Sequence, residues 1–357
     1  MRICFVAHAR SANTTSWANY MADALRHDVH VVSLCASQGL SGSVTLHVLP
    51  VRGPRSLRYV QALPIIRGAV RKIAPDVVVG YRVMSYGFLA AVAGVHPLVV
   101  AAQGRVVSPP LAALKQMLAG YALRHADLVN SWSQPMTERL LEVGARPERI
   151  LTCPRGIDLG LFAPGKPIGE RSETLLATRT MHRAYRHDII VRALALAAKT
   201  RPRLRGVFVG DGEARAELEA LARELGVGER LEFRGEVDPA SLAELLRNSA
   251  LYVSAVRTDG VSASLLEAMA TGCFPVVTDN AANRLWLDGA NGSLVGGTDP
   301  PGFADAIVSA LESETIRSTA AARNRRVVEE RADIDRNMKA IESAYVALVD
   351  SGTKGRG

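Results

Sequence analysis

The sequence predicts an α/β protein built from two consecutive doubly wound units, each a parallel sheet with helices on both faces. Three observations support this prediction. Short apolar runs, typical of strands buried on both faces, alternate with segments of helical periodicity. The alternation stops once, in the proline- and glycine-rich stretch 162–169 (FAPGKPIG), and then starts again. The chain of 357 residues is also long enough for two hydrophobic cores.

The N-terminal half contains the first series of strands. Apolar runs predict strands at residues 2–7, 29–34, 44–48, 76–79, 98–101, 126–131 and 150–153. Helical spacing predicts helices at residues 16–25 and 57–73, and the second of these ends before Pro75. Strands this short, separated by helical segments, are typical of a parallel sheet.

The C-terminal half repeats the pattern. Strands are predicted at residues 174–178, 206–209, 231–233, 251–254 and 274–278, and helices at 189–199, 214–224, 241–248, 264–270 and 302–311. We therefore predict an N-terminal domain at 1–163, a C-terminal domain at 170–333, and a last helix at 334–350 that packs back on the N-terminal domain. Ligands of doubly wound sheets bind at the carboxyl ends of the strands, so two such domains facing one another would form a cleft for a small molecule.

The composition points to a cytoplasmic globular protein. Hydrophobic residues make up 48% and charged residues 22%, and no stretch of about 18 apolar residues predicts a membrane span. The start of the chain lacks the pattern of a secretory signal. The four cysteines are too far apart for a metal knuckle or a redox pair, which fits a reducing compartment.

Positive charge is concentrated in the N-terminal half. Residues 1–165 carry 17 Lys+Arg and 8 Asp+Glu, whereas residues 166–357 carry 26 and 27. This excess of positive charge in the N-terminal half favours an anionic partner there. The alternative is that the charge only keeps the protein soluble. The basic amphipathic stretch 57–72, interrupted by Pro64, fits peripheral contact with an anionic membrane better than contact with a nucleic acid, and a domain helix with its apolar face inward is the favoured alternative. Only 5% of residues are aromatic and no nucleic-acid motif is present, so a nucleic-acid partner is disfavoured.

The segment 254–272 (SAVRTDGVSASLLEAMATG) combines several features of an anion site. A strand end leads through Asp259 and Gly260 to a predicted helix, whose free N–H groups favour a bound anion. Gly260 permits close approach of the backbone to a phosphate. Glu267 lies one turn into the helix, within reach of hydroxyl groups on such a ligand. The alternative is a loop cap for Asp259 and a solvated helix face for Glu267.

This segment resembles the signature of retaining glycosyltransferases of family GT4, in which two acidic residues flank seven others. The signature is carried here by Asp259-Gly260, Glu267-Ala268-Met269-Ala270, Gly272 and Pro275-Val276-Val277. Further elements similar to the family are Pro154-Arg155-Gly156-Ile157-Asp158, Gly210-Asp211-Gly212, Phe233-x-Gly235-x-Val237 and Asp288-Gly289-x-Asn291-Gly292-x-Leu294-Val295. The resemblance covers residues 125–312 and, more weakly, the start. It implies the GT-B fold, with two Rossmann-like domains facing across a cleft.

The resemblance also implies roles for individual residues. Glu267 would hold the ribose of a nucleotide, and Asp259 would contact hydroxyls of the donor sugar. Arg179 and Arg186 would place positive charge on the diphosphate, with Arg183 as the alternative second cation. The competing interpretation is a basic surface loop. The remaining donor-side positions are Gly260, Val261, Ser262, Ala263, Gly210 and Val237.

Several positions depart from the family pattern. Asp259 is one methylene shorter than the usual Glu, which puts the donor sugar in question. In the V-x-x-H-G segment of the first domain, Gln103 replaces the histidine before Gly104, and Gln cannot act as a general base. The usual glycine-rich first loop is absent. We place His8, Asn13, Thr14, Gln103 and Gly104 on the acceptor side.

The sequence therefore predicts a retaining glycosyltransferase that moves a sugar from a nucleotide diphosphate-sugar, with UDP the usual nucleotide of relatives, to a hydroxyl acceptor. The acceptor is a glycan, a lipid-linked molecule or a small molecule. No cofactor and no metal are expected. Two alternatives stay open: a nucleotide-sugar 2-epimerase and a nucleotide-sugar-binding protein without activity. A dinucleotide oxidoreductase is disfavoured because no G-x-G-x-x-G follows the first strand.

Overall fold

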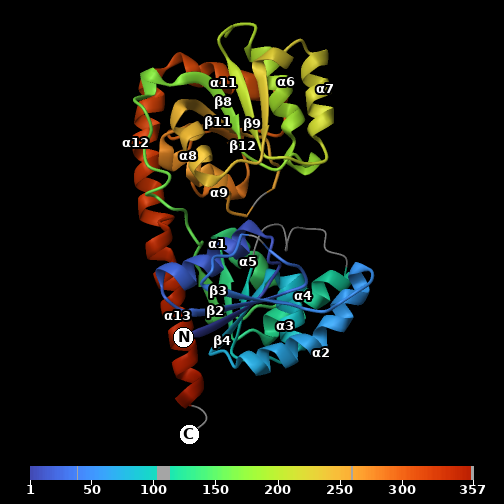
Figure 1. Cartoon of the computed structure of the whole chain (residues 1–357). Helices are drawn as coiled ribbons and strands as arrows, with labels where there is room; N and C mark the ends of the chain where they lie inside the picture. The colour runs from blue at the N-terminus through green and yellow to red at the C-terminus, as the bar shows by residue number, and fades with distance from the viewer. Residues whose placement is uncertain (38, 103–112, 259, 355–357) are drawn as a thin grey trace. The chain divides into compact units, whose positions relative to one another are not determined.

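The computed structural model describes residues 1–37, 39–102, 113–258 and 260–354. The chain forms two compact units (Figure 1). The N-terminal unit contains Met1–Arg155 together with Arg336–Gly357, and the C-terminal unit contains Gly156–Asp335. Both units are doubly wound α/β structures, so the predicted fold class is found in each.

The N-terminal unit has a seven-stranded parallel sheet in the order β3-β2-β1-β4-β5-β6-β7. The strands are β1 (Arg2–Val6), β2 (Asp28–Ser33), β3 (Val44–Val48), β4 (Val77–Tyr81), β5 (Leu98–Ala101), β6 (Leu128–Ser131) and β7 (Ile150–Thr152). β4 is buried along its whole length, as expected for a central strand covered on both faces.

Helices cover both faces of this sheet. They are α1 (Ala12–Asn19), α2 (Arg55–Ile73), α3 (Phe88–Val92), α4 (Ala113–His125), α5 (Gln134–Val143) and α13 (Ile334–Lys354), with π-helical turns η1 (Tyr20–Ala24) and η2 (Arg82–Gly87) and the 3₁₀ turn η4 (Pro147–Arg149). α2 continues through Pro64 without a break. α13 belongs to this unit: its Tyr345 is fully buried, and Glu342 lies 2.7 Å from Nε2 of His27.

The C-terminal unit has a six-stranded parallel sheet in the order β10-β9-β8-β11-β12-β13. The strands are β8 (Ser172–Ala177), β9 (Arg205–Val209), β10 (Leu231–Gly235), β11 (Ser249–Ser254), β12 (Phe274–Thr278) and β13 (Ser293–Val295). The helices are α6 (His187–Ala197), α7 (Arg215–Glu224), α8 (Pro239–Asn248), α9 (Ala263–Thr271), α10 (Ala281–Arg284), α11 (Pro300–Glu312) and α12 (Glu314–Arg331), with 3₁₀ turns η5 (Ile168–Glu170), η6 (Arg183–Tyr185) and η7 (Gly228–Arg230).

Two hydrophobic cores lie on opposite faces of this sheet. Leu175 of β8 packs into the core formed with α6, α7 and α11, whereas its neighbour Leu176 packs into the core formed with α8 and α9. This is the alternation that a strand imposes on successive side chains. The contiguous apolar residues of each strand therefore serve two helix layers.

The boundary between the units differs from the prediction. It lies at Arg155 and Gly156 rather than in the stretch 162–169. Phe162 is buried in the core of the C-terminal unit, and the N–H of Gly165 donates to the carbonyl of Thr271 at 3.1 Å. The proline- and glycine-rich segment therefore packs on the C-terminal unit and does not connect the two units. Its composition predicts a loop but does not show what that loop packs on.

Gly156 stands at this boundary with a φ of +85°. A Cβ atom there would lie 2.6 Å from the carbonyl oxygen of Ala332, so only glycine fits. The two crossing segments pair at this point, since the N–H of Ile157 donates to the carbonyl of Ala332 at 2.8 Å. The family-like element Pro154-Arg155-Gly156-Ile157-Asp158 thus has a steric reason for its glycine.

Among the helices that the structure describes, none combines the length and the apolar character needed to cross a membrane.

Candidate active site

The strand order of the C-terminal sheet reverses between β8 and β11. The chain leaves these two neighbouring strands in opposite directions, and α/β proteins generally bind ligands beyond the carboxyl ends of the strands at such a point. Arg179 follows β8, and the loop that leads into α9 follows β11. The predicted phosphate-binding groups therefore converge on the topological switch point of this unit.

Hydrogen bonds join these two loops. Nη1 of Arg179 donates to Oγ of Ser262 at 3.2 Å. Ser262 is the N-cap of α9, and its Oγ also accepts from the N–H of Leu265 at 3.3 Å. The hydroxyl of Ser264 donates to the carbonyl of Thr178 at 3.2 Å. The Arg179 guanidinium is thereby held at the N-terminus of α9.

This arrangement brings two positive groups together. The N-terminus of an α-helix carries partial positive charge and unpaired N–H groups, and the guanidinium carries a full positive charge. The ring of Tyr185 lies 4.7 Å from Cζ of Arg179, in a cation–π contact that steadies the side chain. The helix terminus and the guanidinium repel each other, whereas an anion bound between them is attracted by both. The geometry therefore suits a phosphate.

Two glycines place the Arg179 backbone. A Cβ atom on Gly210 would lie 2.9 Å from the carbonyl oxygen of Arg179, and one on Gly212 would lie 2.5 Å from that of Met181. Both glycines have positive φ, +117° and +159°. The N–H of Met181 donates to the carbonyl of Asp211 at 2.9 Å. The G-x-G strand end is therefore needed for the close packing of the β9–α7 turn on the Arg179 loop.

His187, at the start of α6, supports the same loop. Its Nε2 lies 3.1 Å from the carbonyl oxygen of Arg179 and 3.3 Å from that of Thr180, so this nitrogen carries the proton and donates. Nδ1 is buried and has no hydrogen-bond partner among the described residues. Burial lowers the pKa of His187 to about 4, which keeps the ring neutral near pH 7. Sequence reasoning missed this residue.

The loop before α9 and the helix itself place the other donor-side positions. Gly260 is buried, and Val261 and Ala263 are half-buried. Glu267 lies one turn after Ala263 on the same face and is also half-buried. Side chains on a helix generally lean toward its N-terminus, which is the end of α9 that Ser262 caps.

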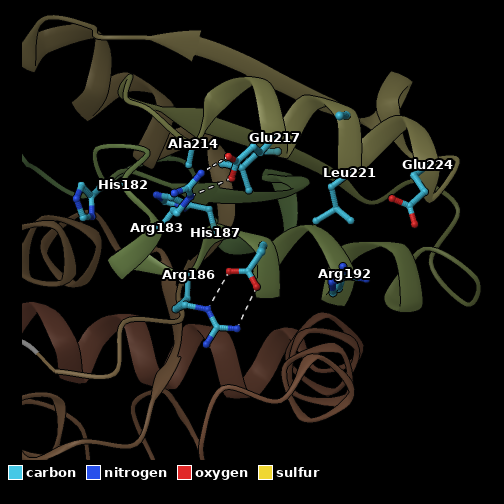
Figure 2. Close-up of a pocket in the computed structure, with 12 residues that line it drawn as sticks. His182, Arg183, Arg186, His187, Arg192, Ala214, Glu217, Leu221 and Glu224 are labelled. Atoms are coloured by element: carbon cyan, nitrogen blue, oxygen red, sulfur yellow. Dashed lines mark hydrogen bonds and ion pairs between the residues drawn. The ribbon is translucent and has the colours of Figure 1, made fainter.

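Arg183 and Arg186 take other partners. Arg183 forms an ion pair with Glu217 of α7, and Figure 2 shows its guanidinium directed at that carboxylate. Arg186 binds Asp188 through two contacts of 3.0 Å each. Both arginines line a pocket of about 650 Å³ between α6 and α7, whose lining includes neither Arg179 nor any residue of α9. The structure therefore brings Arg179, but not Arg183, to the α9 terminus.

The remaining predicted residues lie elsewhere. Val237, after β10, packs against the α8–α9 core. In the N-terminal unit, His8 is exposed after β1, Thr14 is buried in α1, and the carbonyl of Asn13 accepts from the hydroxyl of Tyr81 at 3.2 Å. Asp259, Gln103 and Gly104 lie outside the described residues. Over the described ranges, no group of three or more His, Cys, Asp or Glu side chains is arranged to hold a metal ion.

Both units match known glycosyltransferases. Residues 2–133 match the family described as glycosyl transferase 4-like, and residues 172–313 match glycosyl transferases group 1. The D-inositol 3-phosphate glycosyltransferase of Geodermatophilus obscurus is 30% identical over 225 residues, 58% of this chain and 49% of that protein. The lipopolysaccharide core biosynthesis glycosyltransferase LpsE of Rhizobium meliloti is 32% identical over 154 residues, 42% of this chain and 43% of LpsE.

The chain spans about half the length of the curated relatives it matches. Among solved structures, HepE of Anabaena, crystallised with UDP and glucose, superposes with a TM-score of 0.82 at 18% identity. The match covers 98% of this chain and 100% of HepE. The chain belongs to the GT4-type glycosyltransferases. Its two parallel-sheet units match the GT-B fold, so the predicted family and fold class are confirmed.

His187 predicts a specific pH dependence of stability. Its pKa is about 4 in the folded protein and 6.5 when unperturbed, so between these values the unfolded chain binds a proton that the folded chain does not. Stability should therefore fall as the pH drops from 6.5 to 4, by on the order of 3 kcal/mol from this residue. His187→Gln keeps an N–H donor but cannot titrate, so the free energy of unfolding in urea should vary less with pH. Equal pH slopes for the variant and the parent would contradict this assignment.

Proposed function

We propose that the protein is a retaining glycosyltransferase, which moves a sugar from a UDP-linked donor to a hydroxyl group of an acceptor bound by the N-terminal unit. The observation that carries the proposal is the hydrogen bond of Arg179 to the N-cap of α9 at the switch point of the C-terminal sheet. A diphosphate is the ligand that this pair of positive groups suits best. The structure of HepE in complex with UDP and glucose supports UDP as the nucleotide.

The chemistry requires stabilisation of the leaving group. As the bond between the anomeric carbon and the diphosphate oxygen breaks, negative charge accumulates on the departing diphosphate. Arg179 and the first N–H groups of α9 would stabilise that charge. The acceptor oxygen then bonds to the anomeric carbon on the same face, and its proton passes to the departing phosphate oxygen. A general base from the protein is not needed in this scheme.

Other residues complete the proposed donor site. Asp259 would contact hydroxyls of the sugar, and Glu267 would accept hydrogen bonds from the ribose. The backbone of residues 260–263 would face the diphosphate, with Gly210 and Val237 nearer the nucleotide. Arg186 and Arg183 form ion pairs with Asp188 and Glu217, which compete with a diphosphate for their N–H groups. The proposal therefore depends on Arg179.

A donor screen tests the proposal directly. Nucleotide-sugars with different bases and sugars would be compared by thermal shift, and the best stabiliser would then be tested for hydrolysis without acceptor. UDP-sugars are expected to stabilise the protein most, because ligand binding to the folded state raises its melting temperature. Nuclear magnetic resonance of the released sugar would identify the anomer. Epimerised donor, or tight binding without hydrolysis, would instead support one of the two alternative functions.

Replacing Arg179 should lower turnover strongly. Arg179→Ala removes the cation from the leaving group, and loss of one such electrostatic contact typically costs about 10²–10³-fold in kcat. Arg203→Ala is the matched control, since Arg203 forms an exposed ion pair with Glu173. The rate of donor hydrolysis should change only in the first variant. An Arg179→Ala protein that keeps the parental rate would remove the assignment.

Glu267 should control recognition of the ribose. Hydrogen bonds to a charged group contribute about 1.5–3 kcal/mol, so Glu267→Gln should raise the KM for a UDP-sugar by about 10- to 100-fold. The parent should discriminate against the corresponding 2′-deoxyribose donor, and the variant should discriminate much less. The measurement is kcat/KM for both donors with both proteins. Unaltered discrimination in the variant would show that Glu267 contacts something else.

We also propose a reaction independent of metal and cofactors, at a cytoplasmic location with peripheral contact to anionic membrane. The family resemblance supports metal independence, and the basic helix α2 supports the membrane contact. Donor hydrolysis should continue at the same rate in EDTA. In fractionated cells, the protein should leave the membrane fraction as the salt concentration rises, because exposed charges are screened. Loss of activity in EDTA would overturn the first part of this proposal.

A further inference from the structure

Two adjoining hollows lie in the N-terminal unit. The first, the polar pocket, has a volume of only about 40 Å³ and lies at the carboxyl ends of β1 and β4, the switch point of this sheet. The second is an apolar groove of about 420 Å³ formed by α2, η2, α3 and α4, the helices labelled α2, α3 and α4 on one side of the unit in Figure 1. Tyr59 and Ser85 line both hollows, so the two adjoin.

The polar pocket has the features of an anion site. Thr14 is fully buried, lines the pocket, and its Oγ1 has no hydrogen-bond partner among the described residues. Thr14 lies in the first turn of α1, whose N-terminus adds positive potential. Arg82, which also lines the pocket, has a φ of +71°, a backbone conformation that costs a non-glycine residue energy and often marks functional positions. A buried donor, a helix terminus and a cation thus meet in one place.

The groove offers the opposite chemistry. Val60 and Leu63 of α2, Phe88 and Leu89 of α3, and Leu118 of α4 line it. Val60 is 65% exposed, and Met117, next to Leu118 on α4, is 60% exposed. A contiguous apolar surface open to water is typical of a place where another apolar group binds.

The surroundings of the groove are strongly basic. Residues 51–125 contain ten Lys+Arg and a single acidic residue, Asp76. Arg58, Arg67 and Arg71 are exposed on α2, and Lys115 is exposed on α4. An apolar groove inside a basic surface matches a ligand with a hydrocarbon chain and a negatively charged headgroup.

We propose that the acceptor is a single anionic lipid, whose headgroup lies at the mouth of the polar pocket against Arg82 and whose hydrocarbon chain lies in the groove between α2, α3 and α4. This proposal rests on the proposed function, because it names the acceptor class of that enzyme. It also explains the positive charge of the N-terminal half, which the donor site does not use. Arg82 acts on the headgroup, and Val60 and Leu63 act on the chain.

Binding of a monomeric lipid tests the proposal without any nucleotide. The full chain would be titrated with lysophosphatidylglycerol carrying a fluorescent acyl chain, below its critical micelle concentration. Saturable binding is expected, at least tenfold tighter than for lysophosphatidylcholine with the same chain. Glycerol 3-phosphate, which has no chain, should compete poorly.

Matched variants distinguish binding in the groove from non-specific binding of the lipid to exposed apolar side chains. Val60→Asp places a carboxylate at the groove and should weaken lipid binding at least tenfold. Val48→Asp makes the same change at a 50% exposed valine of β3, outside both hollows, and should leave binding unchanged. Arg82→Gln should remove most of the preference for the anionic headgroup. Melting curves show whether each variant is folded. If Val60→Asp is unfolded, Leu63→Trp, which fills the groove with a larger side chain, replaces it and should also weaken lipid binding.

Two outcomes would overturn the proposal: equal weakening by Val60→Asp and Val48→Asp, or binding only to vesicles with no effect of the groove variants. Donor hydrolysis, measured separately, distinguishes the two proposals. Normal hydrolysis of a UDP-sugar without lipid binding would overturn the lipid acceptor alone. Lipid binding that depends on Val60, in a protein that binds no nucleotide-sugar, would keep the groove and overturn the glycosyltransferase activity.

Discussion

The proposed donor site of this protein depends on holding the Arg179 guanidinium at the N-terminus of α9. Two positive groups do not stay together unaided, and the fold supplies the constraint. Ser262 bonds the guanidinium, Gly210 permits close packing of its backbone, and His187 fixes its carbonyl. The repulsion is therefore present before a ligand arrives. An anion that enters meets groups already oriented toward it and needs little rearrangement, which is the basis of electrostatic preorganisation.

The sheet of the N-terminal unit also has a switch point, with different side chains around it. At the β1/β4 switch point, Arg82 and the start of α1 lie beside the buried hydroxyl of Thr14. The Arg179 loop is bordered by tightly packed glycine turns, whereas this pocket adjoins an apolar groove. The same chain topology thus places positive groups at both switch points, and the side chains around them differ.

Much of the fold could be predicted because strands and most helices have clear local periodicity. α12 could not, since it has no apolar stripe: its buried positions include Arg317 and Asn324, and Asn324 pairs with Asn291 at 2.8 Å instead of packing on apolar side chains. The sequence predicts the boundary at 162–169, after its true position at Gly156. A proline-rich segment has the same composition whether it connects two units or packs on one of them. His187 was missed because a buried histidine and a surface histidine look the same in sequence.

The sequence by itself determined the doubly wound units, the family, and the stretch around α9 in which we propose the donor site, because motif spacing and strand periodicity are properties of short segments. Only the tertiary structure decided which arginine reaches the helix terminus. Arg179 meets Ser262, 83 positions away, while Arg183 is taken by Glu217, 34 positions away. All three predicted arginines lie in one basic loop. The partners of Arg179 and Arg183 come from distant parts of the chain. No local sequence pattern predicts which partner the fold brings close to which arginine.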